Sequence, residues 1–174
     1  MTFAQLSLLP AEPGGAVWVL DASAVIGFKL RLPGAVQWSA FQRLEDFVRA
    51  GQIAMPRQAI REVSEVSHPD VPGAWVAAMR EHFRHPMDVD YQHIETVMRT
   101  VPQVVDPESR DDVADPYVVA LALQLRAMGF QASVVTDDVI DRLPLRIALA
   151  SACKMLDVPW LGGEAFLVAV GILA

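Results

Sequence analysis

The 174-residue chain has one cysteine, few basic residues and few aromatic residues, and each shortage excludes a class of protein. Cys153 has no partner for an internal disulfide and no cysteine set for a metal, so we expect a buried thiol in a cytoplasmic protein. Lys and Arg number 14 against 21 Asp and Glu, so the net charge of -7 provides no general attraction to nucleic acid. Aromatic residues, at 7%, are too few to indicate a stacking platform for bases.

The sequence also has little that indicates a membrane span or a nucleotide-binding loop. Residues 1–16 lack the basic start and long apolar stretch of a signal peptide, and two prolines and two adjacent glycines indicate a loose leader. The apolar run 165–174 has only about half the length that a bilayer requires. No phosphate-cradling glycine loop or nucleophile elbow is present. We therefore expect a soluble protein with no membrane partner.

Short apolar segments alternate with helical patterns along the rest of the chain. The expected strands are 17–20, 52–55, 132–136 and 158–161, with a short edge strand at 86–89. The expected helices are 36–50, 56–66, 74–83, 91–101, 115–129, 145–156 and the residues from 164 onward. This alternation predicts a single α/β domain over residues 17–174, with a central parallel sheet of four to five strands.

Acidic residues are expected to meet at one edge of this sheet. Asp21 ends the first strand, and Asp137 and Asp138 end a later one. The carboxyl ends of parallel strands share an edge, where ligands bind in open α/β sheets. Asp115 opens a helix and Glu62 lies on the second turn of another, both near that edge. Four to five carboxylates are therefore expected in one cleft.

Such a cluster requires a counter-charge. Two carboxylates about 4 Å apart repel by roughly 4 kcal/mol at an effective dielectric of about 20. Either some of the acids are protonated, or a divalent cation neutralises them. An all-oxygen ligand set favours Mg²⁺ or Mn²⁺, the ions of metal-assisted phosphodiester hydrolysis. Taken alone, each acid also has a structural explanation, since Asp115 before Pro116 suits a helix N-cap and Asp137-Asp138 suits a turn.

Four segments of the chain carry these acids. They are Leu20-Asp21-Ala22-Ser23, Pro56 through Glu62-Val63, Ala114-Asp115-Pro116-Tyr117-Val118-Val119-Ala120-Leu121-Ala122, and Val134-Val135-Thr136-Asp137-Asp138. Together with residues 158–167 they resemble the PIN-domain family of metal-dependent nucleases, over about residues 17–166. The third segment is the most specific match. The resemblance implies a three-layer α/β/α fold.

The resemblance also implies an activity and a set of site residues. The family hydrolyses RNA with one or two Mg²⁺ or Mn²⁺ ions, and the metal ligands here would be Asp21, Asp115 and Asp138. Glu62 would complete the catalytic set, either on the metal or through water. Ser23 and Thr136 would support these acids by hydrogen bonding.

Two of the motif acids have a close alternative. Asp137 directly precedes Asp138, so the sequence leaves open which of the two faces the metal. Glu65 follows one turn after Glu62, and helical spacing would put both on one face. The distance from Pro56 favours Glu62.

Many bacterial members of the family are VapC-like toxin ribonucleases, which are inhibited by a small antitoxin and are commonly homodimers. The resemblance therefore implies an RNA substrate, an antitoxin partner and a homodimer. Lys29 and Arg31 are candidate phosphate contacts or plain solubilising residues, as are Arg110 and Arg142. The competing interpretations are a non-catalytic α/β binding module and, with less support, a phosphatase. A haloacid-dehalogenase-type phosphatase needs a second Asp where this chain has Ser23.

Overall fold

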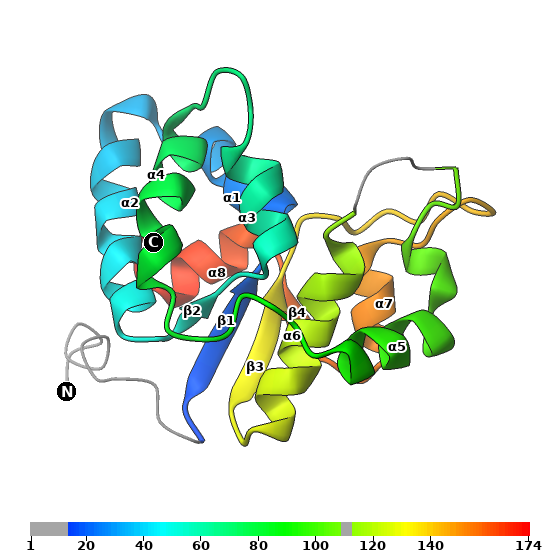
Figure 1. Cartoon of the computed structure of the whole chain (residues 1–174). Helices are drawn as coiled ribbons and strands as arrows, with labels where there is room; N and C mark the ends of the chain where they lie inside the picture. Colours follow the sequence, from blue (N-terminus) through cyan, green and yellow to red (C-terminus); the bar gives the residue numbers. More distant parts are fainter. Residues whose placement is uncertain (1–13, 109–112) are drawn as a thin grey trace.

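The structure is a computed structural model that describes residues 14–108 and 113–174, and it has the α/β fold that the sequence predicts (Figure 1). A parallel sheet of four strands has the order β2-β1-β3-β4. The strands are β1 (Ala16–Leu20), β2 (Ile53–Ala54), β3 (Gln131–Val135) and β4 (Trp160–Leu161). Residues 1–13 of the predicted leader lie outside the described residues, and Ala16 belongs to β1.

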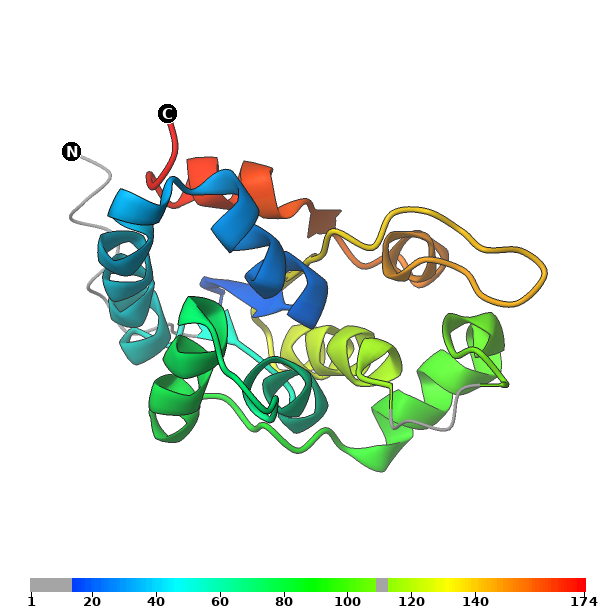
Figure 2. The ribbon, with the colours of Figure 1, turned by 90° about the horizontal axis from the view of Figure 1, so that it is seen from above.

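Helices flank both faces of the sheet, which gives three layers. The α-helices are α1 (Ala22–Arg31), α2 (Gly34–Arg49), α3 (Arg57–Ser64), α4 (Val71–Met79), α5 (Tyr91–Thr100), α6 (Asp115–Ala127), α7 (Leu149–Met155) and α8 (Gly163–Ala169). Two short 3-10 helices are η2 (Arg80–His82) and η3 (Pro102–Val104). Seen from above, α1 and α8 lie on one side of β1, and α6 lies on the other (Figure 2).

The two central strands are buried because they run between these layers. Val17, Val19 and Leu20 of β1 are fully buried, as are Val134 and Val135 of β3. This explains why the sequence of β1 is a short apolar run rather than an alternating pattern. β1 and β3 pair in register from Ala16 with Gln131 to Leu20 with Val135. The residues that follow each strand, Asp21 and Thr136, therefore emerge at the same level of the sheet.

Large side chains fill the space between the sheet and the α1 layer. Phe28, Phe41 and Phe166 are fully buried, and the rings of Phe28 and Phe166 stack at 5.7 Å. The apolar C-terminal run thus packs on the core through Phe166 and Leu167 of α8. No helix in the described part of the chain is long and apolar enough to cross a membrane.

Several sequence predictions about single elements are wrong. Residues 86–89 do not form an edge strand, because they make only bends and one backbone bond from Arg57 N to Met87 O at 2.9 Å. α7 begins at Leu149 rather than at 145, because residues 142–146 form a turn closed by Arg142 N and Arg146 O at 2.8 Å. Pro56 occupies the N-cap position of α3 rather than its first turn. Helix α1 was not anticipated as an element.

Candidate functional site

Asp21 lies at the carboxyl end of β1, between the end of β3 and the start of α1. Its backbone N donates to Val135 O at 3.0 Å, which holds it beside the end of β3. Its Oδ2 accepts hydrogen bonds from Thr136 Oγ1 at 2.9 Å and from Ser23 Oγ. The residue is only 2% exposed. Burial raises the pKa of Asp21, although the hydroxyls of Ser23 and Thr136 oppose this shift.

Asp115 is the first residue of α6 and points into the same edge of the sheet. The N-cap position belongs to Ala114, and no side-chain capping bond is made, so the capping explanation for Asp115 is wrong. Asp115 is 7% exposed. Burial, followed by the nearby charge of Asp21, raises the pKa of Asp115 to about 7, and Asp138 and Glu62 add to this shift. The four acids therefore share one electrostatic environment.

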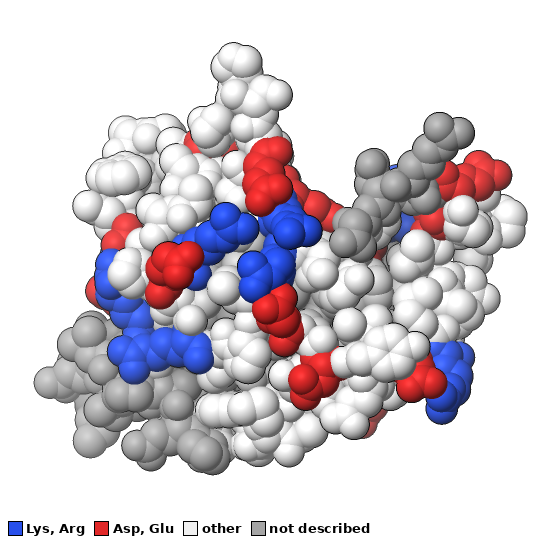
Figure 3. Space-filling model, in the orientation of Figure 1, with Lys and Arg blue, Asp and Glu red and all other residues white. Residues whose placement is uncertain are grey.

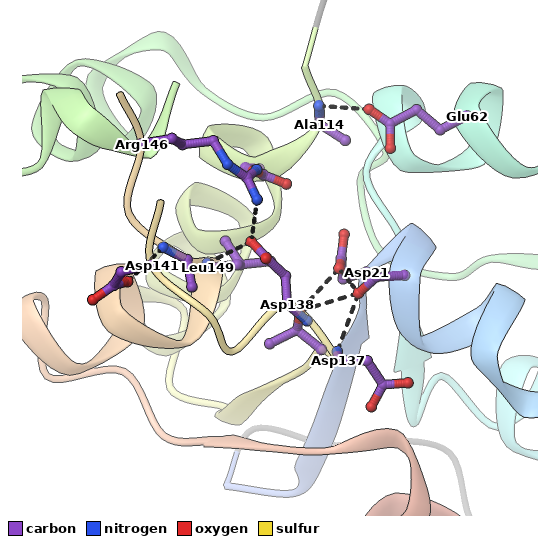
Figure 4. Close-up of polar contacts among 12 residues, drawn as sticks. Asp21, Glu62, Ala114, Asp137, Asp138, Asp141, Arg146 and Leu149 are labelled. Atoms are coloured by element: carbon purple, nitrogen blue, oxygen red, sulfur yellow. Dashed lines mark hydrogen bonds and ion pairs between the residues drawn. The ribbon is translucent and has the colours of Figure 1, made fainter. Parts of the chain in front are cut away.

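Arg146 supplies a positive charge to this environment. Its Nη1 lies 2.5 Å from Asp115 Oδ2. Its Nη2 lies 2.8 Å from Asp138 Oδ2 (Figure 4). One planar guanidinium thus bridges two carboxylates that come from α6 and from the end of β3. The charge of Arg146 lowers the pKa of Asp115, but less than burial and Asp21 raise it. The sequence analysis did not identify Arg146, which is the second basic residue after Asp138 and follows the named candidate Arg142 by four positions.

Asp138 and Asp137 follow the same strand but point to different sides of it (Figure 4). Asp138 Oδ2 accepts from Arg146 and from the backbone N of Leu149 at 2.9 Å, at the start of α7. Asp137 instead pairs with Arg31 Nη1 at 2.7 Å and accepts from Gly163 N at 2.9 Å. The structure therefore joins Asp138 to Asp115 and Asp21, and it turns Asp137 towards α1 and α8.

Glu62 and Glu65, the two candidates from the second motif, are also separated by the structure. Glu62 Oε1 accepts from Ala114 N at 2.9 Å, directly before Asp115 (Figure 4). Glu65 lies beyond the end of α3, is 55% exposed, and is 3.5 Å from Arg80 Nη2. On the face drawn in Figure 3, acidic and basic side chains lie next to one another. Of the two, Glu62 is the residue that reaches the acid cluster.

Lys29 and Arg31, two of the four candidate phosphate contacts, are each paired with a carboxylate. Lys29 Nζ pairs with Asp70 Oδ2 at 2.5 Å, and Arg31 pairs with Asp137. Arg142 is exposed on the loop between β3 and α7. Arg110 lies outside the described residues. The arginine that contacts the predicted metal ligands is therefore one that the sequence interpretation did not name.

Cys153 lies in α7, close enough to the acids for their charges to affect its pKa. It is buried and free, as the sequence predicts. Burial, and then the charges of Asp21 and Asp115, raise the pKa of its thiol to about 12. The thiol therefore stays protonated at neutral pH and is a poor nucleophile or metal ligand.

The donor chemistry of the site suits a hard divalent cation, although its present spacing does not. Asp21, Asp115 and Asp138 offer carboxylate oxygens, the ligands that Mg²⁺ and Mn²⁺ prefer. Within residues 14–108 and 113–174, no group of three or more His, Cys, Asp or Glu side chains is spaced to hold a metal ion. A cation already lies between two of the acids in the form of the Arg146 guanidinium. The residues fit a divalent cation in ligand type and charge, but in this structure Arg146 is paired with two of them.

The sequence matches a family model described as a domain of unknown function (DUF4411) over residues 18–172. No curated protein matches the chain. The matched residues include all four acids of the site and Arg146.

Proposed function

The chain belongs to the DUF4411 family, and we propose that it is a metal-dependent endoribonuclease that hydrolyses RNA phosphodiester bonds. One observation carries this proposal: Asp21, Asp115 and Asp138, which lie far apart in the sequence, converge at the carboxyl edge of the sheet. Asp21 and Asp115 are the buried carboxylates in the described part of the chain. Buried acids with too little positive charge around them are energetically costly, so their presence together favours a role in binding a cation. The PIN-like motifs support the same activity.

Asp21, Asp115 and Asp138 would hold the Mg²⁺ or Mn²⁺ ion, with Glu62 beside them. When bound, the ion would supply Lewis-acid catalysis of phosphodiester hydrolysis. The remaining residues fix the acids in place. Hydroxyls of Ser23 and Thr136 orient Asp21, and the Leu149 N–H orients Asp138. Glu62 also anchors the residue before α6, through Ala114 N.

The finer parts of the proposal concern partners and place. On the basis of the PIN-like motifs, we propose that the protein is the toxin of a toxin–antitoxin pair. A small protein would hold it inactive in the cytoplasm. A homodimer is part of the same proposal. These features rest on the resemblance alone, whereas the activity also rests on the convergence of the acids.

The second candidate function is a non-catalytic α/β binding module, and one observation favours it. Arg146 already neutralises part of the acid cluster, as a permanent structural ion pair would. In that case Arg146 takes the place of a metal ion as the counter-charge of the acids, and no metal binding is expected. The two candidates therefore differ in metal binding and in RNA cleavage.

Both differences are measurable with the purified full chain. We expect cleavage of a mixed RNA substrate with Mn²⁺, and its loss with EDTA. Asp21→Asn and Asp115→Asn keep the size of each side chain but remove a charge, and we expect neither variant to cleave. Glu65→Gln is the matched control, because Glu65 lies on the surface away from Asp115, and it should cleave like the wild type. Equal cleavage by all four proteins would contradict the proposed mechanism.

A further inference from the structure

The guanidinium of Arg146 contacts two of the proposed metal ligands at once. Nη1 contacts Asp115 Oδ2 at 2.5 Å and Nη2 contacts Asp138 Oδ2 at 2.8 Å. All three side chains are largely buried, with exposed fractions of 17% for Arg146, 10% for Asp115 and 16% for Asp138. Charge-assisted bonds in this setting are only weakly screened by water or salt.

A divalent cation and this guanidinium cannot both use the pair. Oδ2 of Asp115 and Oδ2 of Asp138 are both bonded to the guanidinium, and Asp138 Oδ2 also accepts from Leu149 N, so a cation bound to both carboxylates would lie against the guanidinium. Two positive charges in contact at a largely buried site also repel strongly. The absence of any metal-spaced group of acids in the described residues agrees with an arrangement closed on Arg146.

We propose that Arg146 is an internal competitor for the metal site, so that a divalent cation binds Asp115 and Asp138 only when the guanidinium leaves them. This inference rests on the proposed metal-dependent function and adds a self-inhibiting contact to it. In the metal-free chain Arg146 pairs with Asp115 and Asp138 and neutralises part of the acid cluster. In the metal-loaded chain the same side chain turns away from the acids.

The backbone around Arg146 allows such a change without refolding. Residues 142–146 form a closed turn, with Arg146 N bonded to Arg142 O at 3.1 Å. Ile147 N is bonded to Gln103 O at 2.9 Å, which ties the turn to η3. The start of α7 is held separately, by the bond from Ala148 N to Asp141 Oδ1 at 2.8 Å. The exchange therefore needs rotation of one long side chain, which already has partial contact with solvent.

Mn²⁺ affinity measured by calorimetry tests this competition directly. If the guanidinium occupies the acids about 90% of the time, it weakens the apparent metal affinity by about tenfold. Arg146→Met keeps most of the side-chain length without the charge, so we expect it to bind Mn²⁺ about tenfold more tightly than the wild type. Arg142→Gln removes a charge from the same loop at an exposed position and is the matched control, with unchanged affinity expected.

Arg146→Lys keeps the test decisive should the Met variant fail to fold. An ammonium is a point charge that cannot bridge two carboxylates as the guanidinium fork does, so an affinity between wild type and Met is expected. In the wild type, the nitrogen NMR signals of the Arg146 guanidinium, assigned by their loss in Arg146→Lys, should change from a slowly rotating to a freely rotating group when Mg²⁺ is added.

The outcomes separate this inference from the proposed function. Tighter Mn²⁺ binding by Arg146→Met supports the competition even if no RNA is cleaved by any variant. Unchanged or weaker Mn²⁺ binding by folded Arg146→Met, in a protein whose wild type binds Mn²⁺ and cleaves RNA, overturns the competition and leaves the nuclease proposal intact. Absence of Mn²⁺ binding in every variant overturns both.

Discussion

Two regions at the carboxyl edge of the sheet are built from the same parts but have different surroundings. The α8 side consists of Asp137, its partner Arg31 and the N–H of Gly163. The α7 side consists of Asp138, its partner Arg146 and the N–H of Leu149, and it adds Asp115 and Asp21. On each side an aspartate holds one arginine and the start of one helix.

The difference between the two sides lies in the balance of charge. The α8 side has one carboxylate for one guanidinium, which is an ordinary structural ion pair. The α7 side has three carboxylates for one guanidinium, and two of the three are buried. A surplus of buried negative charge is therefore stronger evidence for a ligand-binding site than an acid at the end of a strand. The comparison predicts that equal substitutions on the two sides have unequal consequences.

The largest expected effect concerns the adjacent acids themselves. Asp138→Asn removes a proposed metal ligand, and we expect it to lower the rate of Mn²⁺-dependent RNA cleavage by more than about 100-fold. Asp137→Asn weakens the pair with Arg31 and should leave the cleavage rate close to that of the wild type. Both rates are measured below the melting temperature of the less stable variant. Similar losses in both variants would remove the functional distinction between the two sides.

The second effect is a pH dependence of stability that belongs to the α7 side. The pKa of Asp115 is about 7 in the folded chain and near 3.8 when unfolded, so between these values only the unfolded chain loses the proton. The folded chain then binds more protons, and the free energy of unfolding falls as pH rises through this window. The fall is on the order of 4 kcal/mol at most. It should be seen in urea unfolding of the metal-free protein.

Asp115→Asn is the control for this pH dependence. The amide does not titrate, so the variant should lose most of the fall in stability between about pH 4 and pH 7 that Asp115 causes. Asp137→Asn should keep it, because Asp137 is not among the groups that raise the pKa of Asp115. An unchanged profile in Asp115→Asn would show that the surplus charge on the α7 side does not affect folding.

The parts of the fold and site that could be predicted are those with a local signal. Short apolar runs that stop at Asp21 and at Asp137-Asp138 show both the strands and their carboxyl ends. The rule that parallel strands end at one edge then brings these acids together. The start of α6 at Asp115 was visible because Pro116 and a long apolar helix follow it. Such signals require only neighbouring residues and topology.

The parts that could not be predicted depend on side-chain reach and on where helices stop. Glu62 and Glu65 look equivalent on a continuous helix, but α3 ends at Ser64, so Glu65 leaves the helix face. Arg146 reaches Asp115 because a turn closed by Arg142 replaces the expected start of α7. No periodic pattern encodes either fact. The arginine was therefore missed, although the acids that it binds were found.

A third prediction tests the α8 side through packing. A Cβ atom at Gly27 would lie 2.5 Å from Arg31 Nη1 and from Asp137 Oδ2, so Gly27→Ala displaces that ion pair. We expect a loss of about 1–3 kcal/mol in the free energy of unfolding, with RNA cleavage retained. Gly34→Ala is the matched control, because its Cβ would meet nothing within 4 Å, and it should be neutral or slightly stabilising. Lost cleavage in a folded Gly27→Ala would connect the α8 side to the site.

The smallest expected effect concerns Lys29, which the sequence offered as a phosphate contact. Lys29 pairs with Asp70, which also accepts from Gly73 N at the start of α4, and the pair lowers the pKa of Asp70. Because the pair is partly exposed, Lys29→Met should cost only about 0.2–1 kcal/mol of stability. It should also leave the KM for RNA unchanged, since the ammonium is already engaged.

Asp70→Asn tests more directly whether Lys29 contacts RNA, because the variant removes the carboxylate that pairs with the Lys29 ammonium. Asparagine also caps helices well, so the start of α4 should be preserved. If Lys29 lies within reach of bound RNA, its release should lower the KM, and Lys29→Met in that background should reverse the gain. If the KM is the same in the wild type, in Asp70→Asn and in the double variant, Lys29 does not contact RNA and acts only through Asp70 at the start of α4. A KM that rises in Lys29→Met alone would instead show that RNA draws Lys29 away from Asp70, which favours the phosphate contact over the solubilising residue as the role of Lys29.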